Sequence, residues 1–303
     1  MKDNFDDIDE KKTSNVRDLL KTHLAVMLFG ASGVLARSMT ATALSVTFGR
    51  VLISSISLFT LLKIKRVHLN IHDKRTLLFM LFGGAMMAIH WCSFLGSVKI
   101  ASVAIGTITF ATFPVFITFL EPLLFHEKLR RIHIVEAAIT IIGVLVMIPL
   151  NDLTGDVAFG VLLGMFSSAS YAVLSLINRK LTVNHHSVVI SFYEQTMATV
   201  MVAPVVAFVG LTFVTGDLWR ILVLGVVCTA FSHTLFISAL GKIKVQTASI
   251  ITGMEPVYGI VLAIILLHEP PGVREIIGGV IVFSVTLYST LSAARNGVVN
   301  NVS

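Results

Sequence analysis

The feature that most constrains this chain is an apolar, proline-containing segment that the sequence contains twice. Residues 103–127 and 245–269 align without gaps at a distance of 142 positions, and eight of the 25 aligned pairs are identical. The identical pairs include a Pro-Val step in the middle and a His-Glu step at the end. Proline lacks a backbone donor and clashes with the preceding helical turn. Each copy is therefore predicted to be an apolar helix that is broken near Pro114 or Pro256.

The composition places both copies in a membrane. Of the 303 residues, 55% are apolar and 13% are charged, whereas about 25% of the residues in soluble domains are charged. A helix needs about 20 apolar residues to cross a bilayer, and the sequence has room for ten such spans. The predicted spans are 23–36, 43–62, 76–95, 103–125, 132–150, 159–177, 188–211, 218–240, 247–267 and 274–291.

A turn-rich stretch after residue 150 divides these spans into two sets of five. The predicted segments are a polar tail at 1–21, a five-helix repeat at 22–150, a linker at 151–158, a five-helix repeat at 159–292 and a tail at 293–303. The first tail is polar and acidic, so we expect it to be disordered. No short apolar core with a small-residue cleavage site follows it, which argues against a cleaved signal peptide.

The basic residues predict the orientation in the membrane. If the N-terminus is internal, 18 of the 23 Lys and Arg residues fall in the tails and on the internal loops. Both termini are therefore expected to be cytoplasmic. Because each half has an odd number of spans, the second half is inserted upside down. The prediction is an all-α integral membrane protein of the cell (inner) membrane, with ten transmembrane helices as two inverted five-helix repeats, as in many transporters.

Two phrases carry a resemblance to a known family. The second-half segment KVQTASIITGMEPVYGIVLAIILLHEPP begins at Lys244, and the first copy closes on HEKL. Together with ten spans and proline-bearing fourth and ninth helices, this resembles the EamA family of the drug/metabolite transporter superfamily over residues 22–292. The first copy departs from the family's pattern, because Phe113 stands where an acidic or polar residue often precedes the proline. The resemblance implies secondary transport of small metabolites, commonly export from a bacterial cytoplasm, through a central cavity between the halves. Bacterial relatives include aromatic amino-acid exporters.

Glu255 stands directly before Pro256, near the middle of its span. A carboxylate at this depth is costly unless it is paired, hydrated or protonated. It is either a proton- or cation-responsive group beside the substrate cavity or a structural acid at the kink. Tyr258, three residues later, is predicted to lie on nearly the same helix face and is a further cavity candidate.

Arg50 lies inside the second span and needs a partner, because its charge is permanent. Glu194 and Glu255 from the other half are the predicted partners, in an ion pair that holds the helices together or couples them to transport. Alternatively, Arg50 binds a substrate carboxylate, whose shape its guanidinium group matches.

His90 and Trp91 in the third span correspond to His233 in the eighth, since Trp91 aligns with His233 at the repeat distance of 142. Histidine titrates near neutral pH, and the indole ring offers a stacking face with one donor. These residues and Tyr171 of the sixth span either contact substrate or are core residues with satisfied polar atoms.

Glu121 precedes Pro122 near the predicted cytoplasmic end of its helix, where it is either part of a gate or reaches interfacial water. Glu194 lies at a similarly shallow depth. The His268-Glu269 step is predicted to mark a helix end. Pro114 and Pro256 are the predicted kink or gating residues.

No phosphate-binding loop, nucleophile elbow or metal-ligand cluster occurs in the sequence, and Cys92 and Cys228 lie in separate apolar segments. The sequence therefore predicts no enzyme activity, no metal or cofactor and no nucleic-acid partner. The inverted repeat predicts alternating access, and the resemblance to the EamA family implies a secondary transporter that exports small metabolites, such as amino acids or related compounds. Its expected partners are a small-molecule substrate, the lipid bilayer and protons as coupling ion. The alternatives are a multidrug or metabolite importer or exchanger, and a non-transporting membrane assembly protein.

Overall fold

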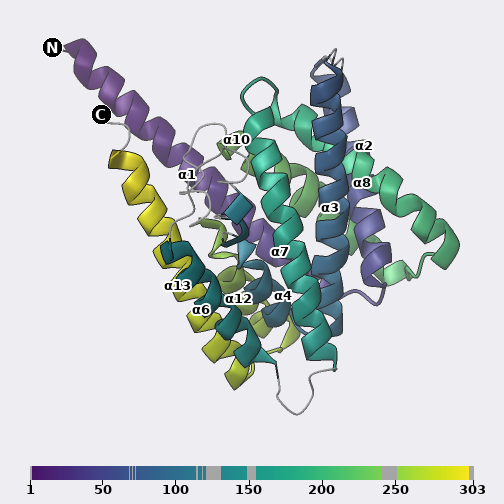
Figure 1. The fold of residues 1–303 in the computed structure, drawn as a ribbon. Helices are drawn as coiled ribbons and strands as arrows, with labels where there is room; N and C mark the ends of the chain where they lie inside the picture. Colours follow the sequence, from purple (N-terminus) through teal and green to yellow (C-terminus); the bar gives the residue numbers. More distant parts are fainter. Residues whose placement is uncertain are drawn as a thin grey trace.

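The computed structural model describes residues 2–67, 69, 71, 73–113, 115–117, 119–120, 131–148, 155–240 and 251–299. Within these ranges the secondary structure is helical, without strands (Figure 1). The elements are α1 (Lys2–Arg37), α2 (Ala43–Ile64), α3 (Lys74–Ile100), α4 (Val103–Phe110), α6 (Arg131–Met147), α7 (Asp156–Leu181), α8 (Ser187–Val209), η1 (Thr215–Asp217), α9 (Leu218–Gly225), η2 (Val226–Phe231), α10 (Ser232–Leu240), α12 (Glu255–Leu267) and α13 (Val273–Val299). The predicted kink residue Pro114 and the predicted gate residue Glu121 lie outside the described residues.

The described helices carry the length and composition of membrane spans. Six segments are long and apolar enough to cross a bilayer. They are Asp18–Arg37, Ala43–Ile64, Lys74–Ile100, Asp156–Leu181, Ser187–Val209 and Thr215–Leu240. Large apolar side chains point outward from the bundle, among them Leu162 (66% exposed), Phe208 (93%) and Ile265 (61%). Extensive apolar surface is unfavourable in water, and it fits a multi-pass membrane protein.

α1 is longer than the sequence predicted. It begins at Lys2, so the prediction of a disordered tail at 1–21 is wrong for the described backbone. The sequence contains no glycine before Gly30 and no proline before Pro114, so nothing interrupts the backbone hydrogen bonds of the helix. Residue 23 therefore marks the start of the apolar part of α1, not the start of the helix.

The two proline-bearing segments are broken, as predicted, where their backbone is described. α4 ends at Phe110 and is followed by a turn at 111–112, while α12 begins at Glu255 after a turn at 253–254. Pro256 therefore lies in the first turn of α12. The missing N–H of proline is harmless there, because the first N–H groups of a helix have no intrahelical partner. Pro256 therefore marks the start of a helix and is not a kink within a continuous helix.

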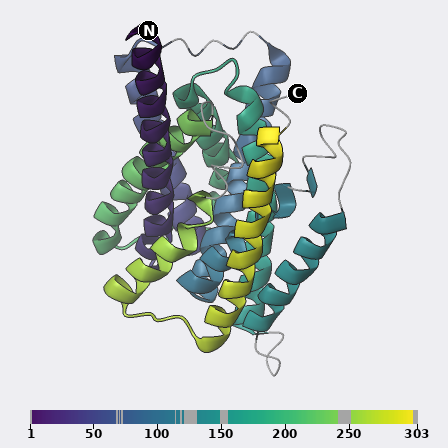
Figure 2. The same cartoon turned by 90° about the vertical axis from the view of Figure 1, so that its left-hand side faces the viewer.

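Helices that are far apart in the sequence pack side by side. α3 packs along α7 and α2 along α8, while α1 lies against α10 and α12. α6 and α13 run together at one edge of the bundle, and the two chain ends lie at the same end of the molecule (Figures 1 and 2). The α1–α12 contact depends on Gly30, because a Cβ atom there would lie 2.9 Å from the backbone nitrogen of Gly259 and 3.0 Å from the backbone carbonyl oxygen of Glu255. This close approach brings Glu255 to the centre of the bundle.

The span predicted at 218–240 is formed by α9, η2 and α10, with the predicted bounds. Its middle element, η2, is a π-helical turn. Within it the hydroxyl group of Thr229 donates to the carbonyl oxygen of Leu224, five residues earlier, at 2.7 Å. Such turns insert one extra residue into a helix and often occur at functional sites.

Candidate functional site

Side chains from six helices meet around a small cavity at the centre of the bundle. The lining residues are Phe29 (α1), His90 and Trp91 (α3), Phe110 (α4), Tyr171 (α7), His233 (α10) and Glu255 (α12). The cavity volume is about 10 Å³, which is room for roughly one water molecule. The structure thus brings together His90, Trp91, Tyr171, His233 and Glu255, five of the six residues predicted for a cavity, on one surface.

Aromatic rings form most of this surface. The ring centroid of His90 lies 4.6 Å from that of Trp91, 4.8 Å from that of Tyr171 and 5.1 Å from that of Phe110. The centroids of Phe29 and His233 are 5.5 Å apart. These separations are typical of favourable aromatic pairs. The rings offer flat apolar faces to an aliphatic or aromatic group.

Phe113, the residue that departs from the family's pattern, extends the aromatic surface. Its ring stacks on Phe110 at a centroid distance of 5.5 Å and an interplanar angle of 15°. It meets Tyr171 edge-on at 5.4 Å. The first copy of the proline segment therefore contributes an aromatic ring where the second copy contributes the carboxylate of Glu255.

Several polar atoms face this apolar surrounding. His90 Nδ1 lies 2.8 Å from the hydroxyl oxygen of Ser167. The Tyr171 hydroxyl, both ring nitrogens of His233 and Oε2 of Glu255 have no hydrogen-bond partner within the described part of the protein. Buried polar groups in proteins are nearly always hydrogen-bonded. These atoms therefore mark the place where a polar ligand or water is best accommodated.

Arg50 is fully buried beside the cavity. Its Nε donates to the hydroxyl oxygen of Thr229 at 2.9 Å, and its Nη2 donates to the carbonyl oxygen of Cys228 at 3.3 Å. Its guanidinium carbon lies 3.3 Å from the ring centroid of Trp91, a cation–π contact. The π-helical turn η2 presents both oxygens to α2, and Arg50 Nη1 has no hydrogen-bond partner among the described residues.

The ion pair predicted for Arg50 is not formed in this structure. Where the chain is described, Arg50 is paired with neither Glu194 nor Glu255. Polar oxygens and an aromatic face hold the guanidinium group instead. Glu194 is 0% exposed in spite of its shallow position along its helix, so the expectation that this depth lets a side chain reach interfacial water does not hold for it.

Tyr258 is the predicted cavity residue that the structure places elsewhere. Its hydroxyl oxygen lies 3.2 Å from His23 Nδ1, between α1 and α12. Three residues along a helix give a net offset of about 60° around the axis and about 4.5 Å along it. At this offset Tyr258 lies beside the face that carries Glu255 and contacts α1 and not the cavity.

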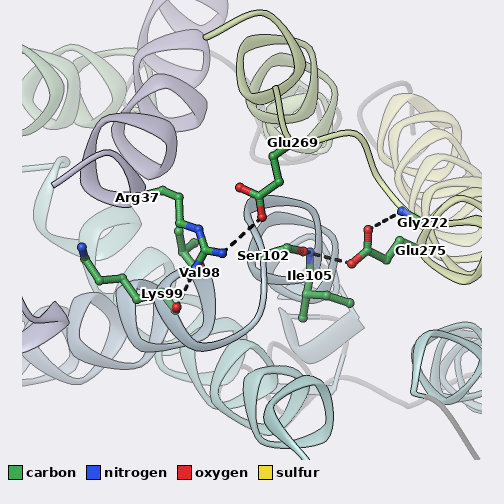
Figure 3. A network of polar contacts seen from close by, with 8 residues as sticks. All are labelled: Arg37, Val98, Lys99, Ser102, Ile105, Glu269, Gly272 and Glu275. Atoms are coloured by element: carbon green, nitrogen blue, oxygen red, sulfur yellow. Dashed lines mark hydrogen bonds and ion pairs between the residues drawn. The ribbon is translucent and has the colours of Figure 1, made fainter. Parts of the chain in front are cut away.

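A second group of polar residues lies where α1 ends and α13 begins (Figure 3). Arg37 Nη1 donates to the carbonyl oxygens of Val98 at 3.0 Å and Lys99 at 2.5 Å. Its Nη2 lies 3.4 Å from Oε1 of Glu269. Glu269 directly follows His268, which ends α12 in the left-handed conformation (φ 55°), so the predicted helix end is confirmed.

The same group of residues ties α4 to α13. The hydroxyl group of Ser102 accepts the N–H of Ile105, which caps α4, and donates to Oε1 of Glu275 at 3.0 Å. Oε2 of Glu275 accepts the N–H of Gly272 at 2.8 Å. We call Arg37, Ser102, Glu269 and Glu275 the end network. It joins the ends of α1 and α3 to both sides of the α12–α13 turn.

Sequence reasoning missed the apolar members of the site and the partners of Arg50. Phe29 and Phe110 are two of 20 phenylalanines, and nothing in the sequence distinguishes them from core or lipid-facing rings. Cys228 and Thr229 face Arg50 because of a π-helical turn, which apolar periodicity does not predict.

Similarity to known proteins agrees with this architecture. A family model described as the EamA-like transporter family matches residues 19–148 and 158–291. An uncharacterized transporter of Archaeoglobus fulgidus is 26% identical over 264 residues, which are 86% of this chain and 92% of the relative. The uncharacterized transporter YxxF of Bacillus subtilis is 21% identical over 271 residues, 88% of this chain and 87% of the relative. One solved crystal structure superposes with a TM-score of 0.66 at 15% identity, covering 93% of this chain and 99% of the other; that likeness concerns the fold alone.

Proposed function

Because the chain belongs to the EamA-like transporter family and is thus a membrane transporter, we propose that it exports small metabolites from the cytoplasm by alternating access. It works as a secondary transporter in the cell (inner) membrane, and its substrates are amino acids or related compounds. In this proposal ten spans form two inverted five-helix repeats at 22–150 and 159–292. Both termini face the cytoplasm.

The observation that carries this proposal is the composition of the central cavity. Its walls combine residues of both proposed repeats, such as Trp91 from the first and Glu255 from the second. In transporters built from repeats, substrate and coupling ions bind near the membrane midplane between the repeats. A cavity between two repeats opens to one side of the membrane or to the other when one repeat moves relative to the other.

The chemistry of the cavity fits an amino acid. Glu255 lines the cavity, and its Oε2 has no hydrogen-bond partner in the described part of the chain. Arg50 packs on Trp91 of the cavity wall, and its Nη1 has no hydrogen-bond partner there either. The carboxylate of Glu255 matches a substrate ammonium group, and the guanidinium group of Arg50 matches a substrate carboxylate. The aromatic surface around His90 and Trp91 takes the side chain. Glu255 also binds the coupling proton in this proposal.

The closed form of the cavity supports a mechanism with moving helices. A volume of about 10 Å³ is far below the roughly 300–1,000 Å³ of small-molecule sites. Substrate binding therefore requires the lining helices to separate. The helix breaks at 111–112 and 253–254 lie next to the cavity and are suited to act as hinges. The end network closes the side that is external in the proposed orientation.

The proposed orientation is tested by cysteine labelling in intact cells. We expect single cysteines in the 64–75 segment to resist an impermeant external thiol reagent and cysteines in the 151–156 segment to react. The reverse pattern would contradict the proposed inverted arrangement.

The transport function is tested by comparing metabolites inside and outside cells that lack or overproduce the protein. We expect one or more amino acids or related compounds to accumulate inside cells that lack it and outside cells that overproduce it. Depletion of the compound from cells that lack the protein would indicate an importer. An unchanged metabolite pattern would favour a non-transporting role.

Binding is then measured on purified protein. The chain has two tryptophans, Trp91 in the cavity and Trp219, which is 58% exposed on α9. Trp219→Phe therefore leaves a cavity tryptophan as the only indole reporter. We expect the identified metabolite to change its fluorescence in a saturable manner. Trp91→Ala removes the reporter, so its binding is measured by isothermal titration calorimetry, in which we expect Trp91→Ala to lose binding and Trp219→Ala, the matched control, to retain it.

A further inference from the structure

Glu194 is a buried carboxylic acid that lies outside the central cavity. Its side chain is 0% exposed, and neither carboxylate oxygen has a hydrogen-bond partner among the residues that the structure describes. It lies seven residues after the start of α8 at Ser187, which is about 10 Å along the helix axis. An ionised carboxylate without a partner costs several kcal/mol at such a place. In this closed form, the neutral acid is the stable state.

The chain makes room for this carboxyl group between α3 and α7. A Cβ atom on Gly83 of α3 would lie 3.0 Å from Oε1 of Glu194 and 3.5 Å from the side chains of Leu174 and Ile177 of α7. A Cβ atom on Gly84 would lie 2.7 Å from the carbonyl oxygen of Glu194. The two glycines therefore let α8 approach α3 closely enough for the side chain of Glu194 to reach α7.

Asn178 of α7 lies close enough to interact with this carboxyl group, although the two side chains do not meet the geometry of a hydrogen bond in this closed form. The side chain of Asn178 is also buried, at 3% exposed, and its Oδ1 has no hydrogen-bond partner within the described ranges. An amide oxygen accepts a hydrogen bond from a protonated carboxyl group, and an amide N–H donates one to the ionised form. A rotation of the Asn178 amide therefore serves both protonation states.

Among the residues that the structure describes, the other groups around Glu194 provide no counter-ion for its carboxyl group. The helices packed against α8 are α2, α3 and α10. Arg50 of α2 is held by Trp91 and Thr229, α3 presents glycines, and His233 of α10 lines the central cavity. From α7, Tyr171 lines the central cavity and interacts electrostatically with both Glu194 and Glu255.

A groove at the end of the bundle comes within about one helical turn of Asn178 along α7. It has a volume of about 530 Å³ where α3 begins and α7 ends, and its lining includes Thr76, Lys180 and Leu181. Leu181 lies three residues after Asn178 in α7, about one helical turn. We propose that Glu194, with Asn178, is a second proton-binding site that exchanges its proton with the cytoplasm through this groove. When the groove opens inward, the carboxylic acid of Glu194 transfers its proton to water and becomes a carboxylate; the reverse step restores it.

The role of this site in transport rests on the proposed function, but proton binding at Glu194 is testable without a substrate. Hydrophobic carbodiimides modify protonated carboxyl groups in apolar surroundings. The experiment treats purified full-length protein with dicyclohexylcarbodiimide and quantifies the Glu194 and Glu255 peptides by mass spectrometry. In the Glu255→Gln variant, modification of Glu194 is measured without competition from the carboxyl group of the cavity. The partly exposed Glu275 is the internal control for modification of a carboxyl group that water can reach.

We expect Glu194 to be modified at low pH and the modification to be lost as the pH is raised, because only the protonated carboxyl group reacts. Gly83→Ala should lower the modification of Glu194, because the added methyl group displaces Oε1, and leave that of Glu255 unchanged. The absence of modification at low pH, or modification that does not depend on pH, would overturn the proposal. Protection by sodium ions at constant pH would overturn it as well, since the site would then bind sodium.

Transport in vesicles separates this inference from the proposed function. We expect Glu194→Gln to bind the metabolite in the Trp91 fluorescence assay with affinity within about twofold of the parent, yet to lose acceleration by a proton gradient. If the parent binds no metabolite while Glu194 titrates, the transport proposal fails and the proton site stands. If transport is normal and proton-driven in Glu194→Gln, the second site fails and the transport proposal stands.

Discussion

The central cavity and the end network differ in whether their polar groups have hydrogen-bond partners. In the cavity, the Tyr171 hydroxyl, the His233 ring and Glu255 Oε2 are buried among aromatic rings without protein partners where the structure is described. In the end network, Arg37 and Glu275 each bond to groups on other segments of the chain. Both regions lie at contacts between the proposed repeats.

The difference teaches which region holds the closed form together and which region leaves chemistry for a ligand. A satisfied and partly exposed network stabilises one arrangement of helices modestly. Buried groups without partners destabilise the empty site, and a ligand that supplies the missing hydrogen bonds recovers that free energy. The cavity is therefore expected to be sensitive to substitutions that alter binding, and the end network to substitutions that alter the population of the closed form.

The strongest test places the same substitution in both regions. Glu255→Gln removes the ionisable carboxyl group from the cavity, so we expect a loss of about 1.5–3 kcal/mol, roughly 10- to 100-fold, in metabolite affinity together with the loss of pH-dependent transport. Glu275→Gln should change affinity less than about threefold, because Glu275 lies outside the cavity. Affinity is measured by Trp91 fluorescence and transport in vesicles. Equal effects of the two substitutions would remove the distinction between the regions.

A second test concerns the helix contact that positions Glu255. Gly30→Ala puts a Cβ atom 2.9 Å from the backbone nitrogen of Gly259. Because backbone atoms cannot easily move to relieve this steric clash, we expect the folded state to be destabilised by about 1–3 kcal/mol. Gly33→Ala is the control, because its nearest neighbour is a ring atom of Phe94 at 3.6 Å, an ordinary contact. Thermal unfolding of the purified variants measures both. A stable Gly30→Ala protein with normal transport would show that α1 and α12 adjust freely.

A double-mutant cycle tests how strongly the residues of the end network interact. Arg37 and Glu269 are 29% and 27% exposed, so we expect their coupling to be about 0.2–1 kcal/mol. Arg37→Gln should have the larger effect of the two single changes, because Arg37 also donates to two carbonyl oxygens. Quenching of Trp91 by a water-soluble quencher measures opening of the cavity. No change in quenching in the double variant would show that the network does not hold the cavity closed.

The smallest effect is expected at the helix break. Pro256 lies in the first turn of α12, where alanine is also accepted, so Pro256→Ala should alter unfolding by less than about 1 kcal/mol. Alanine permits the helix to extend backwards and stiffen the break, so transport should slow by about two- to threefold, a barrier change of roughly 0.5 kcal/mol. Full transport activity in this variant would make the break incidental to the movement of the helices.

The sequence predicted the elements that depend on apolar length and proline. The spans at 43–62 and 218–240 begin where α2 and α9 begin, because each is an apolar run bounded by polar residues. The start of α1 was not predicted, since a polar segment without glycine or proline gives no sign of where the helix begins.

For the site, polar residues inside apolar spans were informative. His90, Trp91, Tyr171, His233 and Glu255 were singled out on that ground, and the structure brings them to one cavity. Position along a helix alone was less informative. Glu194 is near a helix end but is buried, because the two glycines of α3 that admit it belong to a distant part of the sequence.

The π-helical turn η2 has a consequence for how a single span meets its neighbours. One additional residue rotates everything that follows by about 100° relative to an uninterrupted α-helix. Before the turn, α9 packs against α2; after it, α10 packs against α1 and places His233 in the cavity. The span thereby serves two different partners along its length. Deleting one residue within 226–231 would restore a regular helix but put its second half out of phase, and the two contacts could not be made together.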